Sequence, residues 1–142
     1  MEDCITYFEN TLSSNQTLSV PNLPTNFKAE FKVYRTTSSS NTAWIEVGSN
    51  SNNMILFGNA GSTGHMGIFV KINGSYVANE GIDGRVSVNN WTELTYTYND
   101  GVQTITDGTE TVTLTNNQIT ARSYVYFRRV NNSMKELKFK PL

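Results

Sequence analysis

Two segments of alternating side chains, residues 44–48 and 123–129, carry the groups best suited to bind a sugar. In an extended strand, the apolar residues of each segment fall on one face and the polar or aromatic residues on the other. The second set consists of Trp44, Glu46, Tyr124, Tyr126 and Arg128. Aromatic rings pack against the C–H groups of sugars, while carboxylates and guanidiniums hydrogen-bond to hydroxyls. If both strands belong to one sheet, we expect Trp44, Glu46, Tyr126 and Arg128 to form a shallow groove.

Further side chains are available to such a groove. Tyr34 and Tyr76 are additional aromatic platforms, and Asn131 is an additional polar partner. A plainer interpretation also fits these residues: the tyrosines only cover a sheet, and Glu46 forms an ion pair with Arg128.

The carboxylates do not have the arrangement of a glycoside hydrolase. A retaining enzyme needs two carboxyl groups about 5 Å apart. Glu46 has no second acid two or four positions along its strand, and Glu80 and Asp83 lie among glycines in an expected loop. We therefore predict a protein that is not an enzyme and has no catalytic residues, with hydrolysis kept as an alternative.

The sequence also offers no recognisable metal site. His65 is the only histidine, follows Gly64 and is predicted to be a loop residue. Asp83, Asp100 and Asp107 each precede a glycine, so each is explained as a turn former. We expect no cofactor and no metal ligand. Calcium, which needs roughly six or more oxygen ligands, is chemically possible without a recognisable site.

Composition and charge narrow the class of protein. The 142 residues are enough for a single domain spanning 1–142, and the chain holds eighteen Asn and eighteen Thr. This bias favours strands and turns, although a nucleotide bias of the genome explains it equally well. A net charge of −1 gives no basic field for nucleic acid or an anionic membrane. Cys4 is the only cysteine, which excludes an internal disulfide.

The N-terminal and C-terminal segments give two further expectations. Residues 1–4 are acidic and lack an apolar run, so we expect no signal peptide, and no segment is long enough for a membrane span. Lys135, Lys138, Lys140 and nearby Arg129 gather close to the C-terminus. Lysines on an edge strand block unwanted pairing, and we assign these residues to that role.

Hairpin signals recur along the chain and predict its fold. Asn73-Gly74 and Asp100-Gly101 supply the left-handed residues of tight turns between alternating segments. Residues 54–58 are continuously apolar, as in a central strand covered on both faces. Nothing sustains an amphipathic helix, and only 116–121 might form a single turn. Ten to thirteen short strands predict an all-β, two-sheet antiparallel jelly-roll sandwich.

One stretch resembles a known superfamily. The run from Trp91 through Leu94–Tyr98, the Asn99–Gly101 turn and Asp107-Gly108 resembles the concanavalin A-like lectin/glucanase superfamily, including its laminin-G-like domains. The closing segment 134–139 is similar to that family's last strand, which returns beside the first.

Two departures qualify what the resemblance implies. Ile105 stands where the family has an aromatic residue, and no metal-binding cluster of aspartates is recognisable. The hydrolases of the superfamily carry Glu-x-Asp-x-x-Glu on one strand, which this chain lacks. The resemblance therefore implies the fold, and a fold alone does not determine function.

Together these observations favour a non-catalytic carbohydrate-binding or adhesion module. Its expected partner is a polysaccharide or cell-surface glycan, with no nucleic acid and no membrane. Because the superfamily includes phage tail and adhesin domains, we expect a phage tail or microbial surface protein, located on an extracellular surface or virion. The alternative is a structural virion or appendage protein that assembles as a homo-oligomer or with other subunits.

Overall fold

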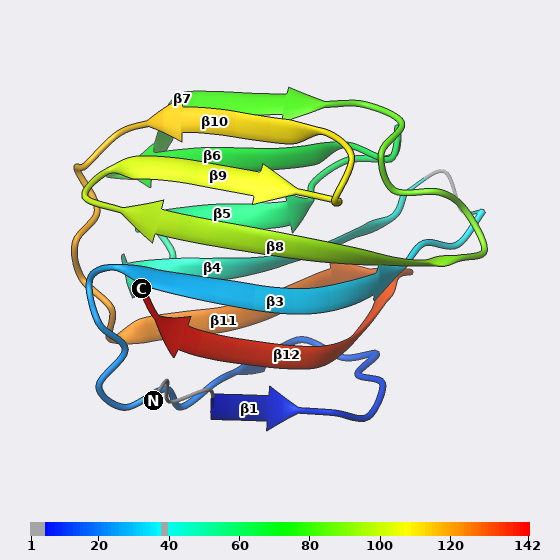
Figure 1. Ribbon diagram of the computed structural model, residues 1–142, viewed down its shortest axis with the longest axis horizontal. Coiled ribbons are helices and arrows are strands. Elements are labelled where there is room, and N and C mark those ends of the chain that lie inside the picture. Colours follow the sequence, from blue (N-terminus) through cyan, green and yellow to red (C-terminus); the bar gives the residue numbers. More distant parts are fainter. Residues whose placement is uncertain (1–4, 38–39) are drawn as a thin grey trace.

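Two six-stranded β-sheets stack face to face (Figure 1). The computed structural model describes residues 5–37 and 40–142. Sheet A contains, in spatial order, β1 (Ile5–Phe8), β12 (Ser133–Pro141), β3 (Phe27–Tyr34), β8 (Trp91–Asn99), β9 (Val102–Thr106) and β10 (Thr111–Thr115). Sheet B contains β2 (Gln16–Thr17), β11 (Tyr124–Val130), β4 (Thr42–Asn50), β5 (Asn53–Asn59), β6 (Met66–Ile72) and β7 (Ser75–Ile82).

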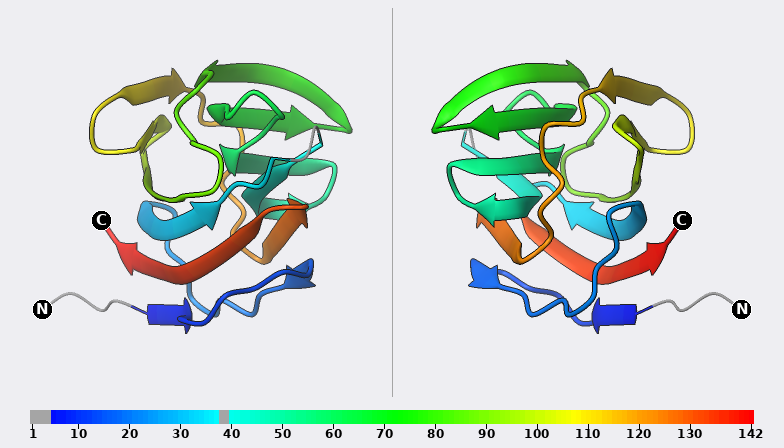
Figure 2. Two further views of the ribbon diagram at one scale, coloured as in Figure 1. Left: turned by 90° about the vertical axis from the view of Figure 1, so that its right-hand side faces the viewer. Right: turned by 90° about the vertical axis from the view of Figure 1, so that its left-hand side faces the viewer.

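Neighbouring strands in both sheets pair antiparallel, and the two layers lie side by side when the molecule is turned by a right angle (Figure 2). This architecture confirms the predicted antiparallel sandwich. None of the described residues belongs to a helix, so none of these residues forms a helix that could cross a membrane. The predicted turn at 116–121 is wrong, because these residues are irregular. Cys4 and residues 38–39 lie outside the described residues.

The predicted hairpins form because their turn residues accept positive φ. Asn73 and Gly74 have φ of 49° and 82°, and Asp100 and Gly101 have φ of 50° and 89°. Consecutive positive values characterise the tight turn whose twist matches paired strands. These turns set the registers of β6 with β7 and of β8 with β9.

The core lies between the sheets and is built from alternating residues. In β3, every second residue from Phe27 to Val33 is fully buried. The rings of Phe57 from sheet B and Tyr96 from sheet A stack with centroids 3.8 Å apart. Tyr96 donates its hydroxyl to Gln103 Oε1 over 2.8 Å, so its buried polar group is satisfied. Leu94, Tyr96 and Tyr98 of β8 are all buried and therefore build this core.

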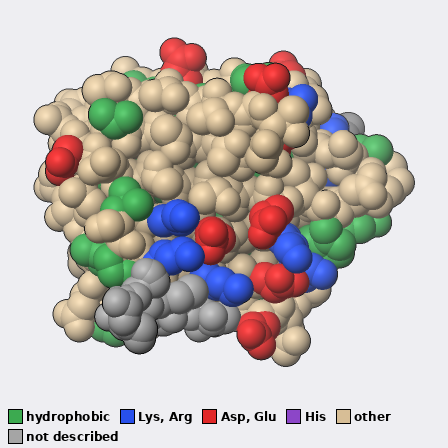
Figure 3. All heavy atoms as spheres, in the orientation of Figure 1, with side chains coloured by type: hydrophobic (Ala, Val, Ile, Leu, Met, Phe, Trp, Pro, Cys, Tyr) green, Lys and Arg blue, Asp and Glu red, His purple; other side chains and the backbone are tan. Residues whose placement is uncertain are grey.

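The expectation for the C-terminal lysines is wrong. β12 lies between β1 and β3 and is no edge strand. Its lysines project onto the outer surface of sheet A, where Lys140 pairs with Glu30 over 3.5 Å. Glu136 of β12 pairs with Lys32 of β3 over 3.2 Å. Figure 3 shows these charges gathered over one part of this face, so the lysines belong to a charged surface rather than to a protected edge.

Candidate functional site

The two segments that carry the predicted groove are adjacent strands of one sheet. β11 pairs with β4 so that Tyr126 lies opposite Glu46, and Arg128 lies opposite Trp44. Alternation buries the intervening Ile45 and Phe127 in the core. The four groove residues therefore share the outer face of sheet B, which is the face turned away from sheet A.

Glu46 is at the centre of a compact polar network. Its Oε2 accepts hydrogen bonds from Trp44 Nε1 over 2.9 Å and from Arg128 Nε over 2.6 Å. Its Oε1 accepts a hydrogen bond from the Tyr124 hydroxyl over 2.7 Å. The Glu46 side chain is only 2% exposed, whereas that of Arg128 is 37% exposed. Glu46 thus positions its neighbours and is not itself open to a ligand.

The network fixes the charge of its members. Burial raises the pKa of Glu46, but the hydrogen bonds from Arg128, Trp44 and Tyr124 outweigh burial and leave the pKa below its ordinary value of 4.5. The hydrogen bond to Glu46 raises the pKa of Arg128. Burial and then the bond to Glu46 raise the pKa of the Tyr124 hydroxyl. At neutral pH the site holds a carboxylate and a guanidinium, with a neutral phenol.

Next to this network, two tyrosines of β11 stack against each other. The rings of Tyr124 and Tyr126 are 6.1 Å apart and nearly parallel, with an angle of 3° between their planes. The guanidinium carbon of Arg128 lies 4.8 Å from the centroid of the Tyr126 ring. The predicted Tyr-Tyr-Arg stripe is therefore a continuous stack, and the ion pair of the plainer interpretation is present as well.

On the other side of Trp44, the face is hollowed. Trp44, Leu56, Ala60, Phe69 and Tyr76 line a space of about 170 Å³, which we call the aromatic hollow. Leu56 is buried at its base, while Tyr76 is 51% exposed. The ring of Tyr76 meets that of Phe69 edge to face at 5.5 Å. Burial and the charge of Glu46 both raise the pKa of Tyr76.

Two of the suggested residues lie away from this site. Tyr34 belongs to β3 of sheet A, where its ring packs against Trp91 at 5.4 Å. Alternation within a strand cannot tell which sheet that strand joins, so the sequence could not show that Tyr34 lies on the other sheet from Trp44. Asn131 follows β11 and donates its side-chain amide to the carbonyl of Ser40.

Sequence reasoning missed a feature on β5, β6 and β7. Gly58 lies opposite Gly67, and Gly67 lies opposite Gly81, so three glycines line up across neighbouring strands. We call these residues the glycine row. Its position next to Trp44 follows from the pairing of Trp44 with Gly58. Glycines leave a strand surface without side chains, which allows another group to lie close to the backbone.

His65 occupies that space. A Cβ added at Gly81 would lie 2.0 Å from His65 Nε2, and one at Gly67 would lie 2.8 Å from the same ring. His65 Nδ1 is 2.7 Å from Asp83 Oδ1, which also accepts the Thr63 hydroxyl over 2.7 Å. The imidazole is 6.0 Å from Phe69 and extends the aromatic surface. No sequence motif marks this arrangement, because the glycines are brought together only by strand pairing.

The outer face of sheet B offers side chains that could contact a ligand. Glu46 has a lowered pKa, which is opposite to the raised value that a general acid needs. Among residues 5–37 and 40–142, no group of three acidic, histidine or cysteine side chains is placed to hold a metal ion. What the face presents is aromatic rings, a fixed guanidinium and an oriented imidazole.

The two antiparallel sheets, with the last strand beside the first, form a concanavalin A-like jelly-roll sandwich. This fold is similar to that of galectins and of a carbohydrate-binding module. The galectin LEC-6 of Caenorhabditis elegans superposes with a TM-score of 0.71 at 10% identity, over 96% of each chain. The carbohydrate-binding module CBM66 of Bacillus subtilis gives 0.71 at 10% identity, over 96% of this chain and 94% of that one.

A toad ovary galectin, solved in complex with thio-digalactose, is similar with a TM-score of 0.61 at 12% identity, over 90% of this chain and 96% of that one. No protein-family model matches the sequence, and the comparison with curated proteins gave no match. At these identities the likeness is one of fold. It confirms the architecture that the 91–108 stretch predicted.

Proposed function

We propose that the protein is a non-catalytic carbohydrate-binding module whose ligand lies on the outer face of sheet B. The observation that carries this proposal is the Trp44–Glu46–Arg128 network at the rim of the aromatic hollow. It places an aromatic ring and a charged hydrogen-bond donor side by side on an accessible face. That pairing suits a sugar, which has apolar C–H faces and polar edges.

Each part of the site has a distinct role in this proposal. Trp44 and Tyr76 offer ring surface to the C–H face of a sugar. Arg128 uses its Nε–H on Glu46, and its partly exposed guanidinium can offer N–H groups to ligand hydroxyls. Because Glu46 holds both Trp44 and Arg128, the site is arranged before the ligand arrives, which reduces the entropy lost on binding.

Two fold neighbours support a sugar as the ligand. One is named as a carbohydrate-binding module, and the other is a galectin in complex with thio-digalactose. A fold alone does not determine function, so the argument depends on the residues of the outer face.

The test uses the two tryptophans of the chain, one on each sheet. A glycan array identifies a ligand, and calorimetric titration then compares Trp44→Ala with Trp91→Ala. We expect Trp44→Ala to weaken binding at least tenfold, about 1.4 kcal/mol, and Trp91→Ala to leave it nearly unchanged. No binding to any glycan, or equal loss in both variants, would contradict the proposal.

The setting proposed for this module is an extracellular surface or a virion, where glycans are met. Immunogold labelling of intact cells or particles tests that placement. An assembly role has one supporting observation: β7, an edge strand of sheet B, carries Tyr76 and Val77, each 51% exposed. Light scattering that shows a stable oligomer, dissociated by Val77→Lys, would favour assembly.

A further inference from the structure

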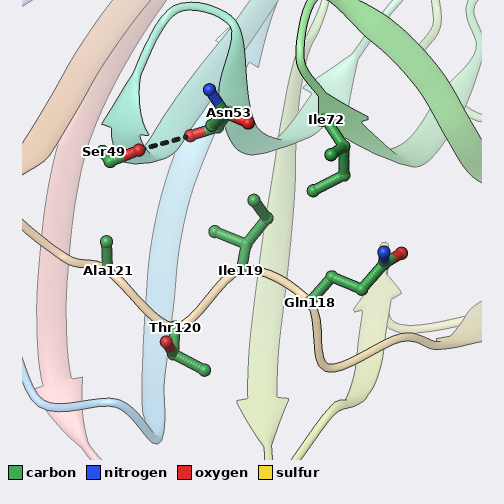
Figure 4. A pocket seen from close by; sticks show the side chains of 7 residues that line it. All are labelled: Ser49, Asn53, Ile72, Gln118, Ile119, Thr120 and Ala121. Carbon is green, nitrogen blue, oxygen red and sulfur yellow. Dashed lines mark hydrogen bonds between the residues drawn. The ribbon is translucent and has the colours of Figure 1, made fainter.

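A second cavity opens at one end of the sandwich, beyond the last buried residues of the core. It measures about 460 Å³ and is lined by Ser49 and Asn53 of the β4–β5 hairpin, by Ile72 at the end of β6, and by residues 118–121 (Figure 4). We call it the end pocket. Residues 118–121 belong to the crossover, the irregular segment 116–123 that connects β10 of sheet A to β11 of sheet B.

Strand alternation explains why a pocket forms there. Ser49 continues the inward-facing row of Ile45 and Val47, and Ile72 continues that of Ile68 and Val70. The pocket is therefore on the inner side of sheet B. The aromatic hollow is on the outer side, and the sheet separates the two.

The floor of the end pocket is held rigidly. Arg122 donates to the carbonyl of Thr25 over 2.9 Å, to that of Ala121 over 2.8 Å and to that of Ile119 over 3.2 Å. The bond to Thr25 ties the crossover to the loop that precedes β3, and the other two hold the backbone of the crossover itself. The Ile119 side chain is 5% exposed and closes the core below the pocket.

The lining determines what the pocket can accept. None of its side chains is charged, which disfavours an ionic ligand that would lose water without a counter-charge. In Figure 4, Ile119 and Ala121 point from the crossover towards the hairpin, whereas Thr120 points away. The Gln118 amide oxygen accepts Asn116 Nδ2 over 2.8 Å, and its amide N–H groups make no hydrogen bond within the described part of the chain. Aliphatic surface and neutral polar groups are thus combined.

We propose that the end pocket is a second binding site, for a small neutral polyhydroxylated molecule such as one or two sugar units. A volume of about 460 Å³ is within the usual range for small-molecule sites, roughly 300–1,000 Å³, while the aromatic hollow is smaller. The lining contains no aromatic residue, so the ligand is held by hydrogen bonds and aliphatic contact rather than by ring stacking. This site is separate from the outer face and does not depend on the function proposed for it.

The test maps binding residue by residue in the intact chain. Amide resonances are followed by NMR during titration with glucose, galactose, mannose, fructose, lactose and sucrose, and with glucuronate as a charged probe. At millimolar concentration, at least one neutral sugar should shift the amide resonances of Ser49, Asn53, Ile72 and residues 118–121. Ala121→Leu, which fills the pocket, should weaken that binding at least tenfold.

Two control variants separate the sites. Thr113→Val changes an exposed side chain of β10, away from the pocket, and should bind normally. Trp44→Ala should also keep the end-pocket shifts. The proposal is overturned if no neutral sugar shifts these residues, if Ala121→Leu leaves the shifts unchanged, or if glucuronate binds as well as glucose. Loss of the shifts in Trp44→Ala would assign them to the outer face and overturn it too.

Discussion

Trp44 donates its indole N–H to Glu46 Oε2 over 2.9 Å, and Glu46 lies two positions further along β4. The same oxygen accepts a hydrogen bond from Arg128 Nε over 2.6 Å. Glu46 therefore holds an aromatic ring and a guanidinium at a fixed spacing. A residue expected to contact the ligand instead orients the residues that can.

Removing that carboxylate should lower stability. Glu46→Ala leaves the donors of Trp44, Tyr124 and Arg128 without their acceptor. We expect the free energy of unfolding to fall by about 1–3 kcal/mol, less than for a fully buried pair, because Arg128 is partly exposed to water. Urea denaturation measures the change. Glu93→Ala, at an exposed position of β8, is the control, and an equal loss there would contradict the assignment.

Stability should depend on pH through the same group. The pKa of Glu46 in the folded protein lies below its ordinary value of 4.5, because its hydrogen bonds outweigh burial. As pH falls, the unfolded chain takes up the proton first, so the stabilisation is complete above about pH 4.5 and decreases as pH drops through the folded-state pKa.

Glu46→Gln removes this titration, and its unfolding free energy should fall less steeply below pH 4.5 than that of the unaltered protein. The unfolding free energy of Glu46→Gln should still depend on pH, because a second carboxyl, Asp107, also has a lowered pKa. Burial raises the pKa of Asp107, but hydrogen bonds from the backbone of Glu110 and Thr109 and from the Arg85 side chain outweigh burial. Denaturant titrations over a range of acidic pH give both slopes. Parallel curves for the two proteins would show that Glu46 does not contribute.

Arg122 should be a main stabilising residue of the sandwich end. Its guanidinium lies 5.3 Å from the Phe27 ring and 4.6 Å from the Tyr98 ring, in addition to its bonds with backbone carbonyls. Lysine cannot reproduce a planar fork of donors, so we expect Arg122→Lys to cost about 2–4 kcal/mol. Arg129→Lys, which removes a donor to Asn132, should cost less. Thermal or urea unfolding compares the two.

The position of His65 should affect ligand binding more than folding. Gly81→Ala adds a methyl group 2.0 Å from the present place of His65 Nε2, so the ring must move. If His65 contacts the ligand, we expect about tenfold weaker binding and a stability change within about 1 kcal/mol. Calorimetry with the ligand found on the glycan array measures this.

Two further variants check the role of His65. His65→Ala should reproduce the loss of binding. Glu80→Ala, one position before Gly81 and exposed, should bind normally. Full binding by Gly81→Ala would mean that the ligand does not reach the glycine row.

Alternation along strands was the most useful sequence signal. It placed Trp44 with Glu46 and Tyr126 with Arg128 on exposed faces, because the period of a strand is local information. Strand partners are not local. For this reason the sequence cannot show that Tyr34 lies on the opposite sheet from Trp44. It also cannot show that Gly58, Gly67 and Gly81 align, because that alignment depends on strand pairing.

The position of β12 within its sheet also could not be predicted from its lysines. A strand with outward lysines has the same sequence pattern at the edge of a sheet and inside it, provided that one face of the sheet is exposed to water. Only the pairing with β1 shows that β12 is internal. The 91–108 stretch predicted the fold because its turns and alternation together describe a local three-stranded meander.

The pairing of β1 with β12 also has a practical consequence for handling the protein. Ile5 lies opposite Phe139, so the start of β1 and the end of β12 are neighbours at one edge of sheet A. The outer face of sheet B points to the other side of the sandwich. A tether attached through the start of β1 or the end of β12 would hold the domain from the side of sheet A and leave that face directed away from the support.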